Sequence, residues 1–180
     1  WQVSAAGGTP RPLTFGAGLD TDPDISADGR RLLYTNMRGS AALTVTDLPT
    51  RENREVLERQ SDFFGSAFSP DGERIASFYQ VDSGVHVFTV RTDGRELRQV
   101  THAQGEVNAF PRWSADGAFL YFFRQKPVVS FVKVSATGGT PAEVGPWPLT
   151  SRAPVDPAGT RVVFERGNGD VTDATIVPGL

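Results

Sequence analysis

Short runs of apolar and β-branched residues, separated by small polar turns, recur along the whole chain. The run "RIASFY" (74–79) follows "SPDG", and "FLYFF" (119–123) follows "SADG". Gly and Asp supply the positive φ angles that tight hairpins need, so these phrases predict antiparallel strand pairs. The nearly continuous apolar character of 119–123 indicates a strand buried on both faces, so we interpret this cluster as core and not as a cofactor site.

The hairpin phrase occurs four times at a nearly constant spacing. Its turn glycines follow one another at intervals of 43, 45 and 42 residues and are Gly29, Gly72, Gly117 and Gly159. In the first three copies an aspartate precedes the glycine, namely Asp28, Asp71 and Asp116. The fourth copy, "VDPAG", departs most and has Ala158 instead. A period in the forties predicts a repeat architecture in which each unit buries its faces against its neighbours.

Each repeat divides into four strands. A third run follows the hairpin, as in "VHVFTVR" (85–91), where we expect His86 and Thr89 on an outward face. A fourth follows a further turn, as in "LRQVTH" (97–102). Four antiparallel strands per unit predict an all-β fold, a β-propeller. Residues 51–60 carry alternating charges at helical intervals, but their place in the repeat favours an outer strand over a short helix.

The phrase "FSPDGERIASF" resembles the WD40-like (PD40) repeat of TolB-type β-propellers. The stretches "VSATGGTPAEV" (134–144) and "VSAAGGTPRPLT" (4–14) resemble the same family's turn between the third and fourth strands. Together these matches extend over almost the whole chain. The resemblance implies blades of four strands and a ring of six to eight blades, but no activity, because the motif is structural.

The repeats divide the chain into one partial propeller domain. We expect the end of a preceding blade at 1–15, three blades at 16–58, 59–102 and 103–145, and an incomplete blade at 146–180. Since the chain opens on Trp1 without a signal-peptide pattern, the preferred interpretation is a piece of a longer protein. The alternatives are a four-bladed ring, in which "RPLTF" pairs with the last blade, and a ring built from two chains.

Composition removes several classes of function. A net charge of −3 and a pI of about 5.4 offer no basic field for nucleic acid, and no apolar run reaches the length of a membrane-spanning helix. There are no cysteines, so disulfides and thiolate chemistry are excluded. The residues do not reveal the compartment; the family resemblance alone favours a periplasmic or extracytoplasmic location.

The sequence holds no recognisable catalytic, metal or cofactor site. Asp20, Asp22 and Asp24 alternate as in a calcium loop, but Ile25 and Arg31 stand where an EF-hand needs Gly and Glu. A looser acidic site at the rim is the remaining alternative. The two histidines, His86 and His102, lack a G-x-S-x-G nucleophile or a triad pattern. We therefore predict no catalytic residue, no metal and no cofactor.

Propeller geometry directs the search for a binding site to the loops that join one blade to the next, because these gather at one mouth of the channel. The loops are 15–22, 59–66, 103–110 and 146–152. They carry the candidate binding residues Asp20, Asp22, Phe63, Phe64, Asn108, Phe110, Trp147 and Arg152. Aromatic residues with a few charges suit a protein or peptide surface. Alternatively, Phe64, Phe110 and Trp147 cap the spaces between blades.

These observations lead to two hypotheses. The first is a non-catalytic binding or sensory module that takes a protein, peptide or small ligand at the channel mouth, with self-association through open blade edges as a further expectation. The second is the gating propeller of a larger serine peptidase or amidohydrolase whose catalytic domain lies elsewhere. Both extend the family resemblance by analogy.

Overall fold

The computed structural model describes residues 1–15, 17–59, 64–125, 129–145, 161–163 and 174–176, and all the regular elements in these ranges are β-strands. The strands are β1 (Leu19–Ile25), β2 (Arg31–Met37), β3 (Ala41–Asp47), β4 (Asn53–Arg59), β5 (Phe64–Phe68), β6 (Arg74–Val81), β7 (Gly84–Arg91), β8 (Arg98–Gln99), β9 (Val107–Trp113), β10 (Phe119–Gln125), β11 (Val129–Ser135), β12 (Ala142–Gly145), β13 (Arg161–Val163) and β14 (Ala174–Ile176). The predicted all-β class is confirmed.

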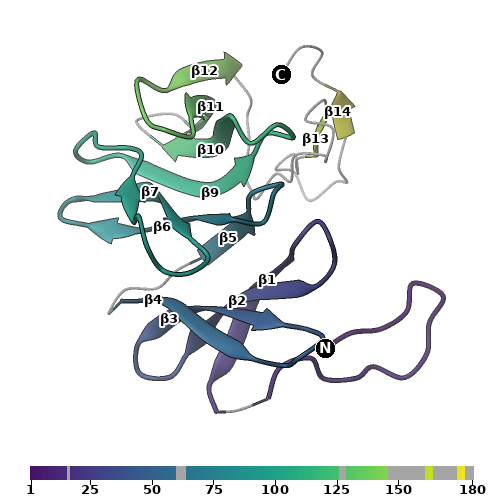
Figure 1. Ribbon diagram of the computed structural model, residues 1–180. Coiled ribbons are helices and arrows are strands. Elements are labelled where there is room, and N and C mark those ends of the chain that lie inside the picture. Colours follow the sequence, from purple (N-terminus) through teal and green to yellow (C-terminus); the bar gives the residue numbers. More distant parts are fainter. Residues whose placement is uncertain (16, 60–63, 126–128, 146–160, 164–173, 177–180) are drawn as a thin grey trace.

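Strands β1–β4 form a four-stranded antiparallel sheet in chain order, which we call the first sheet. Strands β5–β8 (the second sheet) and β9–β12 (the third sheet) repeat this order and are joined by one parallel pairing, Val85 with Val107. Strands β13 and β14 pair antiparallel. Figure 1 shows the three sheets stacked one upon the next, as successive propeller blades are.

The segment that carried two interpretations, 51–60, contains a strand over Asn53–Arg59: β4 pairs antiparallel with β3 from Ala41 opposite Arg59 to Thr46 opposite Asn53. Its alternating charges lie on an outer edge, where charged side chains discourage pairing with another chain. The corresponding β8 is only two residues long.

Hydrophobic side chains fill the spaces between neighbouring sheets. Between the first and second sheets Leu33 and Leu43 pack with Ile75 and with the stacked rings of Tyr79 and Phe88, whose centroids are 3.9 Å apart. The space between the second and third sheets holds a second cluster, formed by Ala76, Phe78, Val87, Val100, Ala109, Leu120, Phe122, Val132 and Val134. Burying one such side chain contributes roughly 1.5–3 kcal/mol, so blade stacking dominates the stability.

The third sheet confirms that 119–123 is core. Leu120, Tyr121 and Phe122 are almost fully buried, and they belong to clusters on opposite faces of the sheet. The prediction of an outward face for His86 and Thr89 was wrong: their exposed fractions are 5% and 1%. Both faces of a middle blade are covered by its neighbours, so β7 has no solvent face to offer these polar residues.

Each of the three described Asp-Gly turns has the same pattern of hydrogen bonds. In the second sheet the Ser69 hydroxyl donates to Asp71 Oδ1 over 2.6 Å and accepts the N–H of Arg74, while Asp71 Oδ1 also accepts the N–H of Glu73. The same bonds connect Ser26, Asp28, Arg30 and Arg31 in the first sheet, and Ser114, Asp116, Ala118 and Phe119 in the third. The motif therefore repeats because each hairpin needs the same side-chain acceptors.

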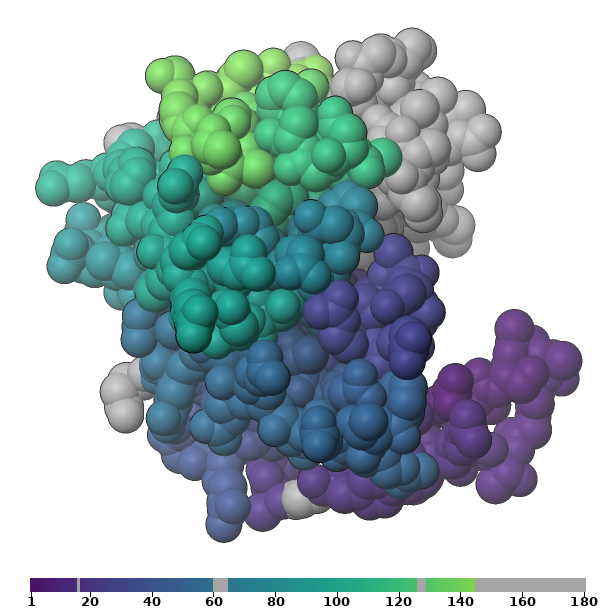
Figure 2. Space-filling view, viewed as in Figure 1, coloured from purple at the N-terminus to yellow at the C-terminus, as the bar shows by residue number. Residues whose placement is uncertain are grey.

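Residues 1–15 form a hairpin whose strands meet at one pair, Gln2 and Arg11. We call it the N-terminal hairpin. Trp1 and Phe15 are 83% and 62% exposed. Figure 2 shows this segment, in purple, standing away from the side of the stacked sheets.

Candidate functional site: the first strands of the blades

The first strands of the three described sheets, β1, β5 and β9, carry the same irregularity. β1, β5 and β9 each shift register against their partner strand, and each has one residue with positive φ at the bulge: Asp22 (φ 50°), Gly65 (φ 61°) and Phe110 (φ 58°). Each of these residues lies seven positions before its turn glycine. The bulge is thus part of the repeat, and we call the three residues the bulge positions.

At two bulge positions the backbone is held in a conformation that L side chains rarely adopt. Holding such a residue in the left-handed region costs about 1–3 kcal/mol, and such residues concentrate at functional sites. Proline follows both Asp22 and Phe110. Because the pairing with the neighbouring strand is interrupted at the bulge, the missing N–H of proline costs no hydrogen bond of the sheet there. The bulge therefore points these two side chains in a direction that differs from the regular alternation of side chains along the strand.

Gly65 and Phe110 fit each other across the second and third sheets. A Cβ at position 65 would lie 2.6 Å from Phe110 Cδ1, so the ring occupies the space that a side chain would need. The same ring stands edge-on to Phe78, with centroids 5.0 Å apart and planes at 68°. The half-buried ring of Phe110 therefore packs between two blades. This agrees with the alternative interpretation, in which Phe110 caps the space between blades.

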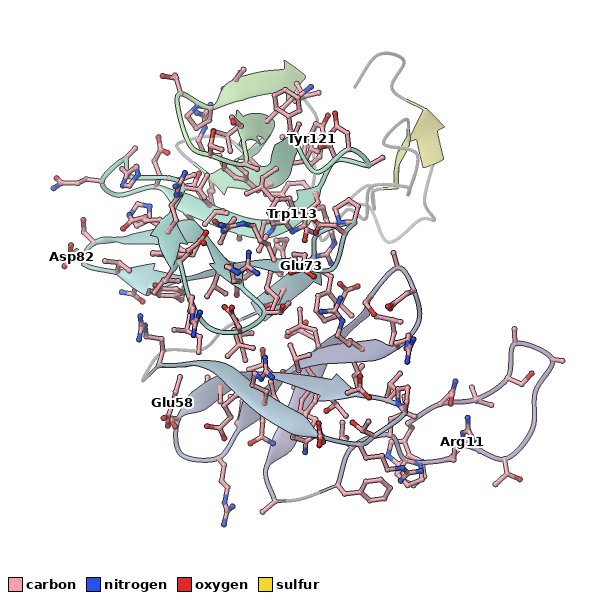
Figure 3. All side chains as sticks on the ribbon, in the orientation of Figure 1. Arg11, Glu58, Glu73, Asp82, Trp113 and Tyr121 are labelled. Atoms are coloured by element: carbon pink, nitrogen blue, oxygen red, sulfur yellow. The ribbon has the colours of Figure 1, made fainter. Side chains whose placement is uncertain are left out.

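Side chains of both neighbouring blades hold the backbone of β5. Asp24 Oδ2 accepts the Phe68 N–H over 2.7 Å. From the other side, Arg112 Nη1 donates to the Gly65 carbonyl at 2.9 Å, and Trp113 Nε1 donates to the Ala67 carbonyl at 3.2 Å. Figure 3 labels Trp113, which reaches from β9 toward β5. These contacts fix the spacing of the three first strands.

Asp24 lies in a place that disfavours its charge. Burial raises the pKa of this carboxyl, and the Phe68 N–H and the charge of Arg112 oppose the shift without cancelling it. The opposite charge of Arg112 comes from the third blade, so the first strands of the first and third blades interact electrostatically across the second.

The structure separates the predicted site residues into two kinds. Asp20 is exposed and its Oδ1 accepts a hydrogen bond from Asn36 Nδ2 at 2.6 Å. Asn108 is fully buried and donates from Nδ2 to the Val85 carbonyl at 3.3 Å, which ties β9 to β7. Its Oδ1 has no partner among the described residues. Asp20 is thus available to a ligand, and Asn108 holds two blades together.

Of the four remaining predicted residues, one can be placed in part and three cannot be placed. Phe64 begins β5 opposite Phe78, and its side chain lies outside the described residues. Phe63, Trp147 and Arg152 lie outside them altogether, as does the fourth turn glycine, Gly159.

The described residues do not assemble a metal centre. They contain no group of three or more His, Cys, Asp or Glu side chains placed to hold an ion. Asp20 and Asp24 instead accept hydrogen bonds from Asn36 and Phe68, respectively.

The histidines lie apart from the bulge positions. His86 Nδ1 is 3.4 Å from the Thr101 hydroxyl, which also accepts the N–H of Val87. Burial lowers the pKa of His86, and the charge of His102 lowers it further, while Glu106 and Asp82 act in the opposite direction. A buried, neutral imidazole inside a blade is a structural group.

Sequence reasoning missed Gly65 and Arg112. A signal was available: counting back seven residues from each turn glycine gives Asp22, Gly65, Phe110 and Arg152, and counting back five gives Asp24, Ala67 and Arg112. Alignment of the repeats on their glycines would have placed these residues at common levels of neighbouring strands.

The part of the chain that the structure describes contains no helix of the length and apolar character needed to cross a bilayer. Among proteins of curated function, none matches this sequence. Solved structures do match. TolB from Acinetobacter baumannii superposes with a TM-score of 0.80 at 15% identity, over 98% of this chain and 45% of TolB.

Two enzymes show the same similarity of fold. An oligogalacturonate lyase in complex with manganese matches with a TM-score of 0.70 at 16% identity, over 86% of this chain and 49% of its own. A puromycin hydrolase matches with a TM-score of 0.68 at 17% identity, over 86% of this chain and 26% of its own. The chain thus spans about half or less of these proteins, and at such identities the similarity shows the fold alone.

The family model described as the TolB beta propeller domain, PD40, matches residues 2–175. The repeated Ser-x-Asp-Gly hairpins and the stacked four-stranded sheets agree with that match. The chain therefore belongs to the PD40 family of TolB-type β-propellers.

Proposed function

We propose that this chain is a non-catalytic binding module that recognises a protein or peptide at the channel mouth, as an interaction or sensory domain of a larger bacterial protein. The observation that carries the proposal is the row of bulge positions, where Asp22 and Phe110 hold costly left-handed backbone conformations at equivalent places in two blades. The irregularity changes the direction of one side chain in the first blade and one in the third, at the same level of their first strands.

The chemistry near the mouth suits an extended, basic peptide. Asp20 and Asp22 lie in the first half of β1, within the predicted mouth loop 15–22, and exposed Leu19 and Val107 begin β1 and β9. Leu19 and Val107 both lie ten residues before their turn glycines, so they occupy equivalent positions in the first and third blades. Apolar contacts with neighbouring carboxylates favour a partner with alternating apolar and cationic side chains.

The fold comparisons support protein binding. One matching structure is described as a nidogen/laminin complex, with a TM-score of 0.61 at 11% identity, and TolB-type propellers are the family of this chain. A periplasmic or extracytoplasmic setting belongs to the same proposal, and rests on the resemblance to TolB.

Selection from a displayed library of random extended peptides tests the proposal. The library is panned against the purified chain, with an Asp22→Gly/Phe110→Gly variant for counter-selection, since glycine relieves the backbone while removing both side chains. We expect enrichment of peptides with Lys or Arg that bind the variant about tenfold more weakly or worse. Peptides that bind both proteins equally, or no enrichment, would overturn the proposal.

A second candidate is the gating propeller of a larger hydrolase. The observation in its favour is the match to puromycin hydrolase and to prolyl endopeptidases, of which this chain covers 26% and 24%. The complete reading frame decides between the two candidates. A following domain with a G-x-S-x-G nucleophile would support the hydrolase candidate, and a frame without a hydrolase domain would remove it.

A further inference from the structure

A hollow lies where the N-terminal hairpin meets the turns of the first sheet. It has a volume of about 410 Å³. Its walls come from the hairpin, from the β1–β2 turn and from the β3–β4 connection, and they consist of Gln2, Arg11, Pro12, Leu13, Gly29, Arg30, Thr46, Leu48, Pro49 and Arg51. We call it the arginine cavity.

Three guanidinium groups and no carboxylate line this cavity. Ion pairs among the described residues include those of Arg74, Arg91 and Arg124, and Arg11, Arg30 and Arg51 take part in none of them. All three are exposed. Because the whole chain carries a net charge of −3, this local excess of positive charge is not a consequence of composition.

Neutral groups orient two of the three arginines. Arg11 donates from Nε and Nη2 to the amide oxygen of Gln2, at 3.0 and 2.8 Å. Arg51 lies over the Phe15 ring, with its Cζ 5.5 Å from the centroid. A guanidinium has five N–H donors, so such contacts hold the group in place and leave donors for another acceptor.

Arg30 differs, because two carboxylates lie within its field. Asp28 and Asp47 have lowered pKa values, caused chiefly by the Ser26 hydroxyl and the Thr50 N–H, respectively, and to a smaller degree by Arg30. Both carboxylates are occupied by these turn hydrogen bonds. Arg11 and Arg51 form no ion pair among the described residues, so their guanidinium groups can bind a ligand.

We propose that the arginine cavity binds an oxyanion group, a carboxylate or a phosphate, of a ligand that enters between the N-terminal hairpin and the first sheet. Bidentate pairing with a guanidinium suits both anions, and Leu13, Leu48 and Pro49 offer apolar contact to the rest of the ligand. None of the predicted mouth residues lines this cavity, and Figure 3 shows Arg11 on the N-terminal hairpin, away from Glu58 at the end of β4.

NMR titration of the ¹⁵N-labelled chain tests this site. The arginine Nε–Hε signals are followed while inorganic phosphate or citrate is added at constant ionic strength. The test variant is Arg11→Gln/Arg51→Gln. The matched control is Arg38→Gln, which removes an exposed charge outside the cavity.

We expect saturable shifts at Arg11, Arg30 and Arg51, about tenfold weaker binding or worse in the double variant, and affinity within about twofold of the parent in Arg38→Gln. A response to citrate alone identifies a carboxylate ligand, and a response to phosphate alone identifies a phosphate. Shifts that do not saturate, that are as large at Arg38, or that survive unchanged in the double variant overturn the site. No shift with either anion overturns it as well.

Discussion

The carboxylate of Asp24 in the first sheet accepts the backbone N–H of Phe68 in the second sheet at 2.7 Å. The two residues are 44 positions apart, about one repeat. Arg112 and Trp113 hold the same strand from the third sheet. Blade order is therefore fixed by polar contacts along the first strands as well as by the apolar clusters between the sheets.

The Asp24–Phe68 contact predicts that two substitutions of Asp24 differ in their effect on stability. Asp24→Ala leaves the Phe68 N–H without its acceptor, and should lower the free energy of unfolding by about 1–3 kcal/mol. Asp24→Asn keeps an acceptor oxygen and removes a charge that burial disfavours, so it should be neutral or stabilising at pH 7. Urea unfolding measures both. Asp20→Ala, at an exposed hydrogen bond, is the control and should change stability by less than about 0.5 kcal/mol.

The bulge predicts a coupling between Gly65 and Phe110. Gly65→Ala places a methyl group against the ring at a backbone angle that disfavours alanine, and should cost about 2–4 kcal/mol. Adding Phe110→Ala removes the clash but not the backbone strain. The double variant should therefore lose less stability than the sum of the single variants, by about 1 kcal/mol or more. Strict additivity in urea unfolding would show that the two residues do not share this space.

The Ser-x-Asp-Gly turns predict a loss of stability in acid. The Ser69 hydroxyl, followed by the Glu73 N–H, lowers the pKa of Asp71, and equivalent bonds lower those of Asp28 and Asp116. Such carboxylates stabilise the fold above their ordinary pKa, and the contribution disappears as the pH falls through the lower folded values. Asp24, whose pKa is raised, acts in the opposite sense.

Ser69→Ala isolates this effect. NMR titration should show the pKa of Asp71 rising toward its ordinary value, while that of Asp116 in the third sheet is unchanged. The unfolding free energy of the variant should fall less steeply with decreasing pH than that of the parent chain. An Asp71 pKa that is the same in variant and parent would falsify the assigned cause.

The sequence was sufficient for the fold because the repeat carries its own chemistry. Ser69, Asp71 and Gly72 specify a hairpin by local hydrogen bonds and a positive φ, so their spacing predicts the blades. The first-strand contacts were not predictable in the same way. Arg112 reaches the Gly65 carbonyl across 47 positions, and Asn108 becomes buried only because β7 and β9 meet at Val85.

Those contacts depend on how far one blade is rotated on the next, which local propensities do not determine. The bulge positions are an intermediate case. Their constant distance from the turn glycines is visible in the sequence, but their backbone conformation is not, since Asp22 and Phe110 have little in common with Gly65 except their place in the repeat.

Buried His86 predicts a second, separate effect of pH. Burial first, and then the charge of His102, lowers its pKa, so the folded state favours the neutral ring. Below the ordinary pKa of about 6.5 the unfolded chain takes up a proton that the folded chain resists, and stability should fall between about pH 6.5 and the lower folded value. Asp82 and Glu106 reduce the shift without reversing it.

In His86→Gln this part of the pH dependence should disappear, whereas His102→Gln, at an exposed neighbour, should retain it. Urea unfolding at pH 7.0, 6.0 and 5.0 separates this transition from that of the turn aspartates, which lies below about pH 4. A parent chain whose stability is unchanged between pH 7 and pH 5 would show that the imidazole is protonated as readily in the blade as in the unfolded chain.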